Sequence, residues 1–336
     1  MAHATPPLPR SSWRFRFFRR VLRAMASLLI VCGLVAAILV FLNARTPSQT
    51  DLAKCLSGKP VFPPQQRVEL TLVSLDLQGR FHIPGPAARA YLEEVAQVVV
   101  AQHPDVAAFQ EVLNQQDRDT LISVLDKAGL VYHAHFPAGL RGSGLLIASR
   151  HPFSERCYHR FVASGDWFRP WRGDWYMGKG VAFVRLQLPE DAGNIDLFNV
   201  TLHARYRDAP YADVRRRQMA EAMEFIARAG GRAPVLLAVS PLNGSGFGPE
   251  CNLLTAPGCV SGWCAVKGYG PGVDSISSED LTPKLPPARR DHTGVWVRPR
   301  GAVCRIHIGA VPGNASPPSA PAESPAPSAI TQADGS

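Results

Sequence analysis

The stretch HPDVAAFQEV (103–112) decides how the chain folds and where its chemistry is placed. Val106 to Phe109 is a short apolar run that predicts a buried strand. Glu111 follows almost at once, so its carboxylate is expected to emerge where this strand ends. An isolated carboxylate there suits Mg²⁺, which prefers oxygen ligands and often takes only one or two carboxylates. The alternative interpretation is a surface glutamate that precedes a helix.

Periodic patterns on both sides of this stretch predict a mixture of strands and helices. Strands are expected at Val68 to Leu77, Gly144 to Ser149, Val181 to Leu188, Ile195 to Leu202, Val235 to Val239 and Gly294 to Val297. Helices are expected at Ala87 to Gln102, Asp117 to Ala128 and Ala209 to Ala229. Because strands outnumber helices and the helices fall between groups of strands, the pattern favours an α/β (α+β) fold of two sheets covered by helices.

The N-terminal part contains a candidate membrane span. Ala24 to Leu42 carries no charge, and nineteen residues at about 1.5 Å each match the hydrocarbon core of a bilayer. Six arginines crowd the first 23 residues, which by the positive-inside rule keeps the N-terminus cytoplasmic and the main domain extracytoplasmic or lumenal. The alternatives are a cleaved signal peptide and a buried helix.

The composition divides the chain into five segments. We expect a basic cytoplasmic segment (1–23), a transmembrane signal anchor (24–42), a linker (43–66), one large domain (67–311) and a disordered Pro/Ala/Ser-rich tail (312–336). The net charge of +9 would ordinarily suggest nucleic acid, but the arginines beside the apolar segment account for much of it, so nucleic acid is an unlikely partner.

Cysteines are compatible with an oxidising compartment. Cys32 lies in the apolar segment, and six others form an even set: Cys55, Cys157, Cys251, Cys259, Cys264 and Cys304. Disulfides are therefore possible, but the sequence does not give their connectivity.

Seven segments carry a family resemblance. They are LTLVSLDLQG (70–79), HPDVAAFQEV (103–112), GSGLLIASRHPF (142–153), GDWYMGKGVAFVRLQL (173–188), VTLHARY (200–206), LLAVSPLN (236–243) and RRDHTGV (289–295). In order and spacing they resemble the neutral sphingomyelinases, within the endonuclease/exonuclease/phosphatase superfamily. This resemblance implies a four-layer α/β sandwich of two mostly antiparallel sheets flanked by helices, and metal-dependent cleavage of a phosphodiester.

The resemblance also implies a role for particular residues. Glu111 and Asp76 would bind Mg²⁺. Apart from the resemblance, Lys179 in the GKG turn could contact a phosphate or a lipid headgroup, or be a solvated turn lysine. His292 would be the general base, a task that suits a group with a reference pKa of about 6.5. Asp291 would support the metal side, Asn243 would hold the phosphate, and Asp274 would orient His292.

Three positions depart from the family pattern. Asp76 stands where asparagine is expected, although aspartate also binds metal. Thr201 stands at the first histidine of Thr-His-Leu-His, while His203 matches the second; a one-residue shift that placed His203 in the pocket would require a bulge. Ser240-Pro241-Leu242-Asn243 replaces Gly-Asp-x-Asn, and proline offers neither a charge nor an N–H donor.

These features favour a membrane-anchored, Mg²⁺-dependent phosphodiesterase that converts sphingomyelin to ceramide and phosphocholine, with a membrane lipid and the bilayer as partners. The alternative is a catalytically degenerate, lipid-binding family member, and a nuclease or phosphoinositide phosphatase is less expected. An aromatic cluster suits a membrane interface or a choline headgroup, or else ordinary loop packing. It comprises Trp167, Phe168, Trp171, Trp175 and Tyr176.

Overall fold

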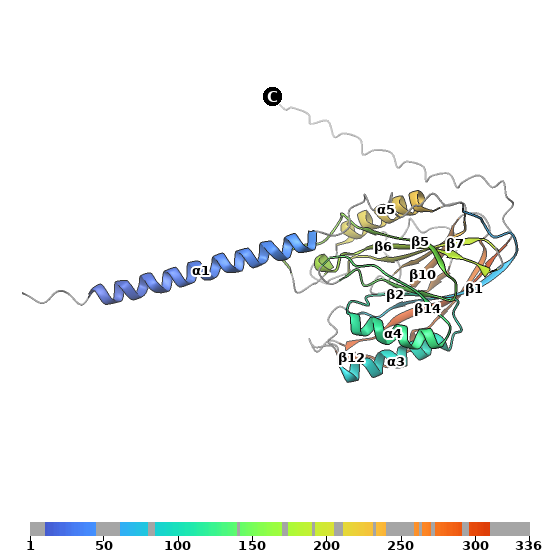
Figure 1. Ribbon diagram of the computed structural model, residues 1–336, viewed down its shortest axis with the longest axis horizontal. Helices are drawn as coiled ribbons and strands as arrows, with labels where there is room; N and C mark the ends of the chain where they lie inside the picture. Colours follow the sequence, from blue (N-terminus) through green and yellow to red (C-terminus); the bar gives the residue numbers. More distant parts are fainter. Residues whose placement is uncertain are drawn as a thin grey trace, which may run out of the picture. The chain divides into compact units, whose positions relative to one another are not determined.

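A computed structural model describes most of the chain and divides it into two compact units, Met1–Thr46 and Pro47–Ser336 (Figure 1). The residues described are 11–44, 61–79, 85–139, 142–169, 174–189, 192–204, 211–230, 233–239, 259–261, 264–269, 273–290 and 296–309. Helix α1 lies in the first unit, and the other described elements lie in the second.

The first sheet of the large unit has the strand order β11-β14-β1-β2-β4-β3. Its strands are β1 (Val68–Asp76), β2 (Val106–Gln110), β3 (Tyr132–His135), β4 (Leu146–Ser149), β11 (Val273–Asp280) and β14 (Arg300–Ile308). Only β1 and β2 pair in parallel, because helix α3 (Pro86–Val100) connects them as a crossover. Helix α4 (Gln115–Lys127) follows β2.

The second sheet repeats this arrangement with the order β5-β6-β7-β8-β10-β9. Its strands are β5 (Phe153–Arg160), β6 (Gly180–Gln187), β7 (Asn194–Thr201), β8 (Val235–Val239), β9 (Cys259–Ser261) and β10 (Cys264–Tyr269). The parallel pair is β7 and β8, joined through helix α5 (Ala212–Ala229). Each sheet therefore contains one βαβ crossover among antiparallel neighbours.

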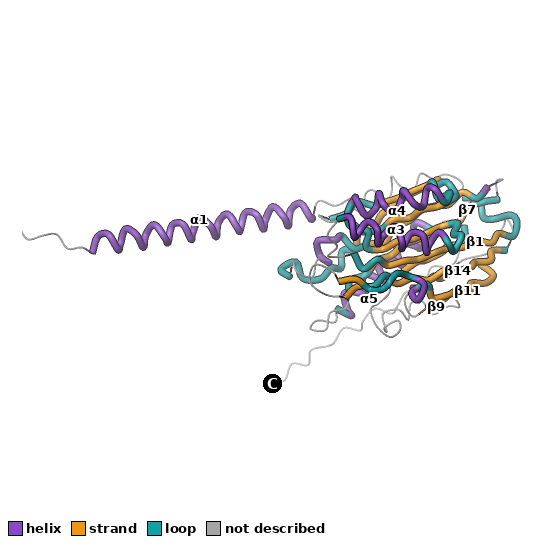
Figure 2. Tube along the Cα trace, turned by 90° about the horizontal axis from the view of Figure 1, so that it is seen from below, coloured by secondary structure: helices purple, strands orange, loops and turns teal. Residues whose placement is uncertain are grey.

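Three apolar clusters separate four layers. The inner cluster joins the facing sides of both sheets, from Leu72 on β1 to Leu197 on β7. The second packs α3 and α4 on the first sheet, and the third packs α5 on the second sheet. Figure 1 shows α5 on one side of the strands and α3 with α4 on the other, and Figure 2 shows α3 and α4 side by side. The predicted two-sheet α/β sandwich is confirmed.

The predicted elements before residue 240 are largely confirmed, and the errors lie mostly near the C-terminal end. Of the strand expected at Gly294 to Val297, the described residues form β13 (Trp296–Val297), which pairs with β12 (Arg289–Arg290); Gly294 and Val295 lie outside the described residues. The long strand is β14, whose inner positions are apolar while Arg305 and His307 are exposed. Strands β3 and β5 were not predicted, because polar side chains interrupt both runs.

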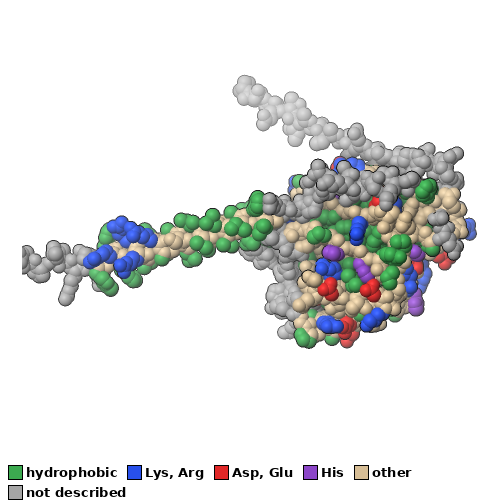
Figure 3. All heavy atoms as spheres, viewed as in Figure 1, with side chains coloured by type: hydrophobic (Ala, Val, Ile, Leu, Met, Phe, Trp, Pro, Cys, Tyr) green, Lys and Arg blue, Asp and Glu red, His purple; other side chains and the backbone are tan. Residues whose placement is uncertain are grey.

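Helix α1 (Ser11–Ala44) is long and apolar enough to cross a bilayer, with a candidate span at Phe15–Leu42. Figure 3 shows its basic side chains gathered toward the N-terminal end and hydrophobic side chains along the remainder. The helix extends beyond the predicted 24–42 at both ends; at the N-terminal end Arg16, Arg19, Arg20 and Arg23 continue it as strong helix formers.

Candidate active site

Glu111 leaves strand β2 with a backbone conformation that only a constrained residue adopts. Its φ is 61°, in the left-handed region that L-residues with a side chain enter at a cost. Gly144, itself at φ +72°, passes close to it: a Cβ on Gly144 would lie 3.0 Å from Glu111 Cα. Val112 N donates to the Gly144 carbonyl at 2.9 Å, which fixes the turn. The GSG segment therefore holds Glu111 at the end of its strand.

Asp76 ends strand β1, beside Glu111. It pairs with Gln110 in the parallel register, so the two carboxylates come from adjacent carboxyl ends of the first sheet. Asp76 Oδ1 accepts a hydrogen bond from Gln78 N at 2.7 Å, and Arg300 is its partner across β14. Burial lowers the pKa of Arg300, while the carboxylates of Asp76 and Asp280 act in the opposite direction.

Lys179 lies in a tight turn before strand β6. Gly178 has a φ of +52°, and a Cβ there would lie 2.8 Å from the Ala138 carbonyl carbon. The buried Tyr158 hydroxyl donates to the Gly178 carbonyl, and burial raises the pKa of this hydroxyl. These contacts leave little freedom at the turn, so the backbone of Lys179 is well fixed.

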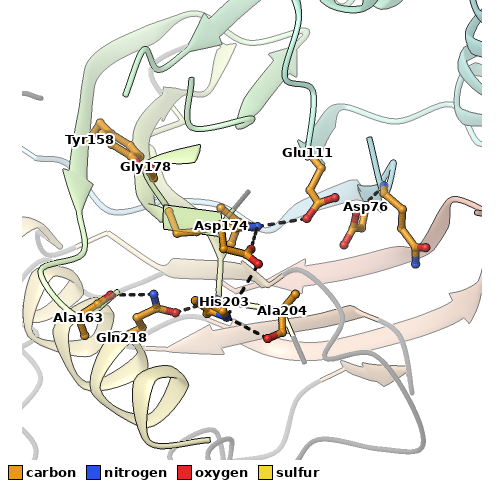
Figure 4. A network of polar contacts seen from close by, with 12 residues as sticks. Asp76, Glu111, Tyr158, Ala163, Asp174, Gly178, His203, Ala204 and Gln218 are labelled. Atoms are coloured by element: carbon orange, nitrogen blue, oxygen red, sulfur yellow. Dashed lines mark hydrogen bonds and ion pairs between the residues drawn. The ribbon is translucent and has the colours of Figure 1, made fainter. Parts of the chain in front are cut away.

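The Lys179 ammonium lies between oxygen atoms from three different segments, and Figure 4 shows two of the residues that supply them, Glu111 and Asp174. It is 3.1 Å from Glu111 Oε1, 3.2 Å from Thr201 Oγ1 and 3.4 Å from Asp174 Oδ1. Lys179 is 6% exposed, and its partners are similarly buried. The contacts with Glu111 and Thr201 are hydrogen bonds, and the contact with Asp174 is an ion pair. Asp174, in the 3₁₀ helix Asp174–Met177, is a site residue that the sequence analysis did not single out.

Thr201 and His203 lie on the same side of the chain as it leaves β7. The β6–β7 register is regular as far as the pair Gly180 and Thr201, so no bulge moves His203 into the position of Thr201. His203 is buried, with Nδ1 2.9 Å from the Ala204 carbonyl oxygen and 4.0 Å from Asp174 Oδ2. Thr201 therefore contacts Lys179, while His203 lies at the edge of the group.

Helix α5 and a neighbouring loop enclose His203. Its backbone N–H donates to Gln218 Oε1 at 2.8 Å, and its ring centroid lies 4.3 Å from that of Tyr211. Gly165 packs directly on the ring, because a Cβ there would overlap His203 Nε2. Figure 4 shows Gln218 on α5 between His203 and Ala163.

A polar bridge links the two sheets directly below Glu111. Gln110 Nε2 donates to Asn199 Oδ1 at 2.7 Å and to Ser74 Oγ at 3.2 Å. Asn199 Nδ2 donates to the Phe109 carbonyl at 3.0 Å, and both amide side chains are fully buried. The only sequence signal for this bridge is a polar residue within each of two apolar strands.

Of the four remaining predicted site residues, the structure describes only Asp274. Asp291, His292 and Asn243 lie outside the described residues, as do Ser240, Pro241 and Leu242. Asp274 is described, but it lies near the start of β11, where Gly309 is its close neighbour. Strand β14 pairs with β1 so that Ile308 faces Val68 and Arg300 faces Asp76, which places Asp274 at the opposite end of the sheet from Asp76. An interaction of Asp274 with His292 stays a prediction.

The donor set suits a hard cation with few protein ligands. Within the described ranges, no three or more His, Cys, Asp or Glu side chains are grouped to hold a metal. Asp76 and Glu111 nevertheless supply two carboxylates from adjacent strand ends, which is the number that Mg²⁺ often takes while it retains water. The residues present therefore fit Mg²⁺ better than zinc, which binds four protein ligands in structural sites and three in catalytic sites.

Comparison with known proteins first shows which class of protein this fold resembles. The fold resembles beta toxin from Staphylococcus aureus, crystallised with bound magnesium ions, with a TM-score of 0.54 and 14% identity over 71% of this chain and 99% of that chain. Sphingomyelinase C from Streptomyces griseocarneus gives the same values. Residues 74–238 match the Endonuclease/Exonuclease/phosphatase family. The chain thus carries a domain of this family with a DNase I-like fold.

Sequence relatives narrow the class to its sphingolipid branch. Inositol phosphosphingolipids phospholipase C of Schizosaccharomyces pombe is 37% identical over 30% of this chain and 24% of its own length. Sphingomyelin phosphodiesterase 2 of Homo sapiens is 32% identical over 41% of this chain and 33% of its own length. The chain spans about a quarter to two fifths of the curated relatives it matches. Its domain is similar to neutral sphingomyelinases, as predicted.

Proposed function

We propose that this protein is a membrane-anchored, Mg²⁺-dependent phosphodiesterase that cleaves sphingomyelin into ceramide and phosphocholine. The observation that carries the proposal is the convergence of Asp76, Glu111, Lys179 and Thr201 from both sheets at one buried site. The similarity to sphingolipid phosphodiesterases supports the choice of substrate class.

Asp76 and Glu111 are the residues that would hold Mg²⁺. Bound there, the cation would supply positive charge at the phosphoryl oxygens of an anionic substrate. The bound magnesium ions of the beta toxin structure support this assignment by analogy. The strained backbone of Glu111 directs its carboxylate away from the strand, toward the side on which Lys179 and Thr201 lie.

Lys179 is the group best placed to donate to a phosphoryl oxygen. The family pattern places a histidine donor at Thr201, and the Lys179 ammonium lies 3.2 Å from the Thr201 hydroxyl. A buried ammonium stabilises the developing negative charge of a phosphoryl transition state more strongly than it would in water. Lys179 therefore offers a physical replacement for the missing histidine.

Hydrolysis also needs a base that removes a proton from the attacking water. Water attacks phosphorus, the bond from phosphorus to the ceramide oxygen breaks, and the ceramide alkoxide takes up a proton. His292 is proposed as the base, with Asp291 in support, and Asn243 is proposed to hold the phosphate.

The second candidate function is lipid binding without turnover. Thr201 occupies the position of an expected histidine, and Pro241 occupies that of an expected aspartate. Moreover, the Lys179 ammonium already neutralises Glu111 and Asp174, so a cation that binds Glu111 has to displace it or share the carboxylate. Each lost charge-stabilising group typically lowers the rate by about 10²–10³.

The proposed location is a membrane with the main domain on its extracytoplasmic or lumenal side. Helix α1 supports a signal anchor, and the arginines at its N-terminal end support a cytoplasmic N-terminus. Cys157 on strand β5 is disulfide-bonded, which suits an oxidising compartment. A membrane lipid is then the natural substrate.

The test is the release of phosphocholine from sphingomyelin in mixed micelles by the full chain, with and without Mg²⁺. We expect Glu111→Gln and Lys179→Met each to lower kcat/KM by about 10²-fold or more. Glu94→Gln on the exposed face of α3 is the matched control and should leave the rate unchanged. Turnover that survives Glu111→Gln or chelation of Mg²⁺ would refute this mechanism.

Restoration variants separate the two candidates. If the folded wild-type chain releases no phosphocholine above Glu111→Gln, the active proposal fails. The degenerate alternative then predicts that Pro241→Asp, combined with Thr201→His, brings back Mg²⁺-dependent release. In an active enzyme the same pair of substitutions should change the rate much less, because Lys179 already supplies the donor.

A further inference from the structure

The loop between strands β5 and β6, residues 161–169, combines exposed apolar side chains with an unusually well-anchored backbone; it is named here the aromatic loop. Outside α1, six large hydrophobic side chains in the described residues are exposed, and three of them belong to this loop. Val162 is 77% exposed, Trp167 54% and Phe168 55%. Folding alone does not account for this concentration of exposed apolar surface.

Helix α5 anchors the first part of the loop. The Glu221 carboxylate accepts from Val162 N at 2.7 Å and from Ala163 N at 2.8 Å. One turn earlier, Gln218 Nε2 donates to the Ala163 carbonyl at 2.8 Å. Because charge-assisted hydrogen bonds are stronger than neutral ones, the backbone on both sides of the exposed Val162 side chain is fixed.

The second part of the loop is anchored by tyrosines from two other segments. The Tyr211 hydroxyl donates to Asp166 Oδ2 at 2.6 Å, and the Tyr176 hydroxyl donates to the Trp167 carbonyl at 3.0 Å. The Trp167 and Phe168 rings meet edge to face with centroids 6.1 Å apart. These aromatic side chains are thus presented to solvent by a rigid frame, which lowers the entropic cost of binding through them.

The aromatic loop also touches the proposed active site. Phe161 N donates to the Lys179 carbonyl at 3.0 Å, and Gly165 packs on the His203 ring. Tyr176 belongs to the same 3₁₀ helix as Asp174, which pairs with Lys179. A surface that binds this loop is therefore held next to the residues that are proposed to contact the phosphodiester.

We propose that the aromatic loop is a bilayer-contacting surface, in which Val162, Trp167 and Phe168 enter the interfacial region of a phospholipid membrane. Amphipathic rings favour that region, and Arg169, whose guanidinium lies 5.7 Å from the Phe168 ring centroid, suits the phosphate level beside them. The candidate span in α1 argues for a bilayer rather than a protein, because a single span keeps a membrane close to the domain. The loop would then select which face of the domain meets the lipid.

The test asks whether the large unit stays on a membrane after its anchor is cut. The full chain, with a protease sequence inserted between residues 45 and 60, is reconstituted in phosphatidylcholine–sphingomyelin vesicles, cleaved and sedimented. The wild-type domain should stay with the vesicles. Trp167→Ser/Phe168→Ser should be released, with about a tenfold or larger rise in the apparent Kd, because each ring loses interfacial burial.

Val131→Ser/Tyr132→Ser is the matched control, since it removes an exposed apolar pair at the edge strand β3. It should remain bound like the wild type. Release of the wild type, retention of the loop variant or equal release of the control would each overturn the proposal. Pure lipid vesicles also exclude a protein partner as the cause of retention.

A second measurement keeps the test decisive if the double substitution impairs folding. Brominated acyl chains should quench part of the tryptophan fluorescence of the wild type, and Trp167→Phe, which keeps an aromatic ring, should lose that part while still sedimenting with vesicles. Quenching that is unchanged by Trp167→Phe would contradict the proposal. None of these readouts requires turnover, so failure of the proposed enzyme function and failure of the loop proposal are distinguishable.

Discussion

Glu111 combines a strained backbone with the carboxylate that the proposed chemistry needs. At φ 61° a side chain costs about 1 kcal/mol or more, a cost that glycine escapes. We therefore expect Glu111→Gly to be more stable than Glu111→Ala by about 1 kcal/mol, with both variants inactive. Urea unfolding of the two proteins measures the difference.

Glu94 provides the control for this order of stability, in which the glycine variant exceeds the alanine variant, because Glu94 lies inside helix α3. There glycine should be less stable than alanine by about 1 kcal/mol. The same preference for alanine at both positions would show that the left-handed conformation of Glu111 does not govern its stability.

The bridge between Gln110 and Asn199 predicts a second residue-scale effect. Asn199→Leu should lower the free energy of unfolding by about 2 kcal/mol or more, because the Gln110 amide and the Phe109 carbonyl lose a buried partner. Gln110→Leu/Asn199→Leu should recover part of that loss, since it removes both amides of the bridge. Thermal or urea unfolding of these two variants and of Gln110→Leu alone checks this coupling, and purely additive losses would contradict it.

Also at the scale of single residues, the local sequence was sufficient to predict a candidate site residue only where its immediate neighbours in the chain fix its position. Glu111 and Lys179 could be singled out as candidates because a buried strand and a pair of glycines position them within a few residues; their roles stay predictions. Asp174 and the amide bridge could not, because His203, a partner of Asp174, lies 29 residues away and Gln110 and Asn199 lie 89 residues apart. The role suggested for Asp274 depended on a strand pairing that the sequence does not reveal.

At the scale of elements, helix α5 holds the aromatic loop through Glu221. Burial raises the pKa of this carboxyl, but hydrogen bonds from His159 and from the N–H groups of Ala163 and Val162 outweigh it, so the pKa is lowered from 4.5. A lowered pKa means that the ionised form adds stability above pH 4.5, and that this contribution is lost as the pH falls through the folded-state pKa.

We therefore expect Glu221→Gln to be less stable than the wild type at pH 7, by about 1–2 kcal/mol. The difference should shrink between about pH 5 and pH 3, as the wild-type carboxylate becomes protonated. Urea unfolding at several pH values measures it. A difference that is constant over this range would show that the charge of Glu221 does not hold the loop.

Elements with a clean period were predictable, and those with mixed patterns were not. Helices α3, α4 and α5 and strands β1, β2 and β6 to β8 follow their predicted ranges, because burial on one or both faces imposes the pattern. Strands β3 and β5 lie at sheet edges and β14 lies between two strands, but all three include exposed polar side chains, so their apolar signal is diluted. The layer order followed from the alternation of strand groups and helices.

At the scale of the whole molecule, the charge on α1 predicts the orientation of the chain in a membrane. Replacement of Arg16, Arg19, Arg20 and Arg23 with serine should invert a substantial fraction of molecules, because the positive-inside bias is removed. Protease protection of the large unit in sealed vesicles, compared with the wild type, measures the fraction. An unchanged pattern would mean that the arginines do not set the topology.

The pair of βαβ crossovers has a kinetic consequence. Asp76 and Glu111 end the parallel strands of one sheet, whereas Thr201 ends a parallel strand of the other, so neither half of the sandwich contains the site alone. The first sheet is completed only by the C-terminal strands β11 and β14, so its carboxylates face Lys179 and Thr201 in a complete sandwich only after the end of the domain has been synthesised. Any activity of this protein should therefore appear only in the last step of folding, when the two sheets pack against each other. A chain that is still being synthesised should not cleave the lipids of the membrane around it.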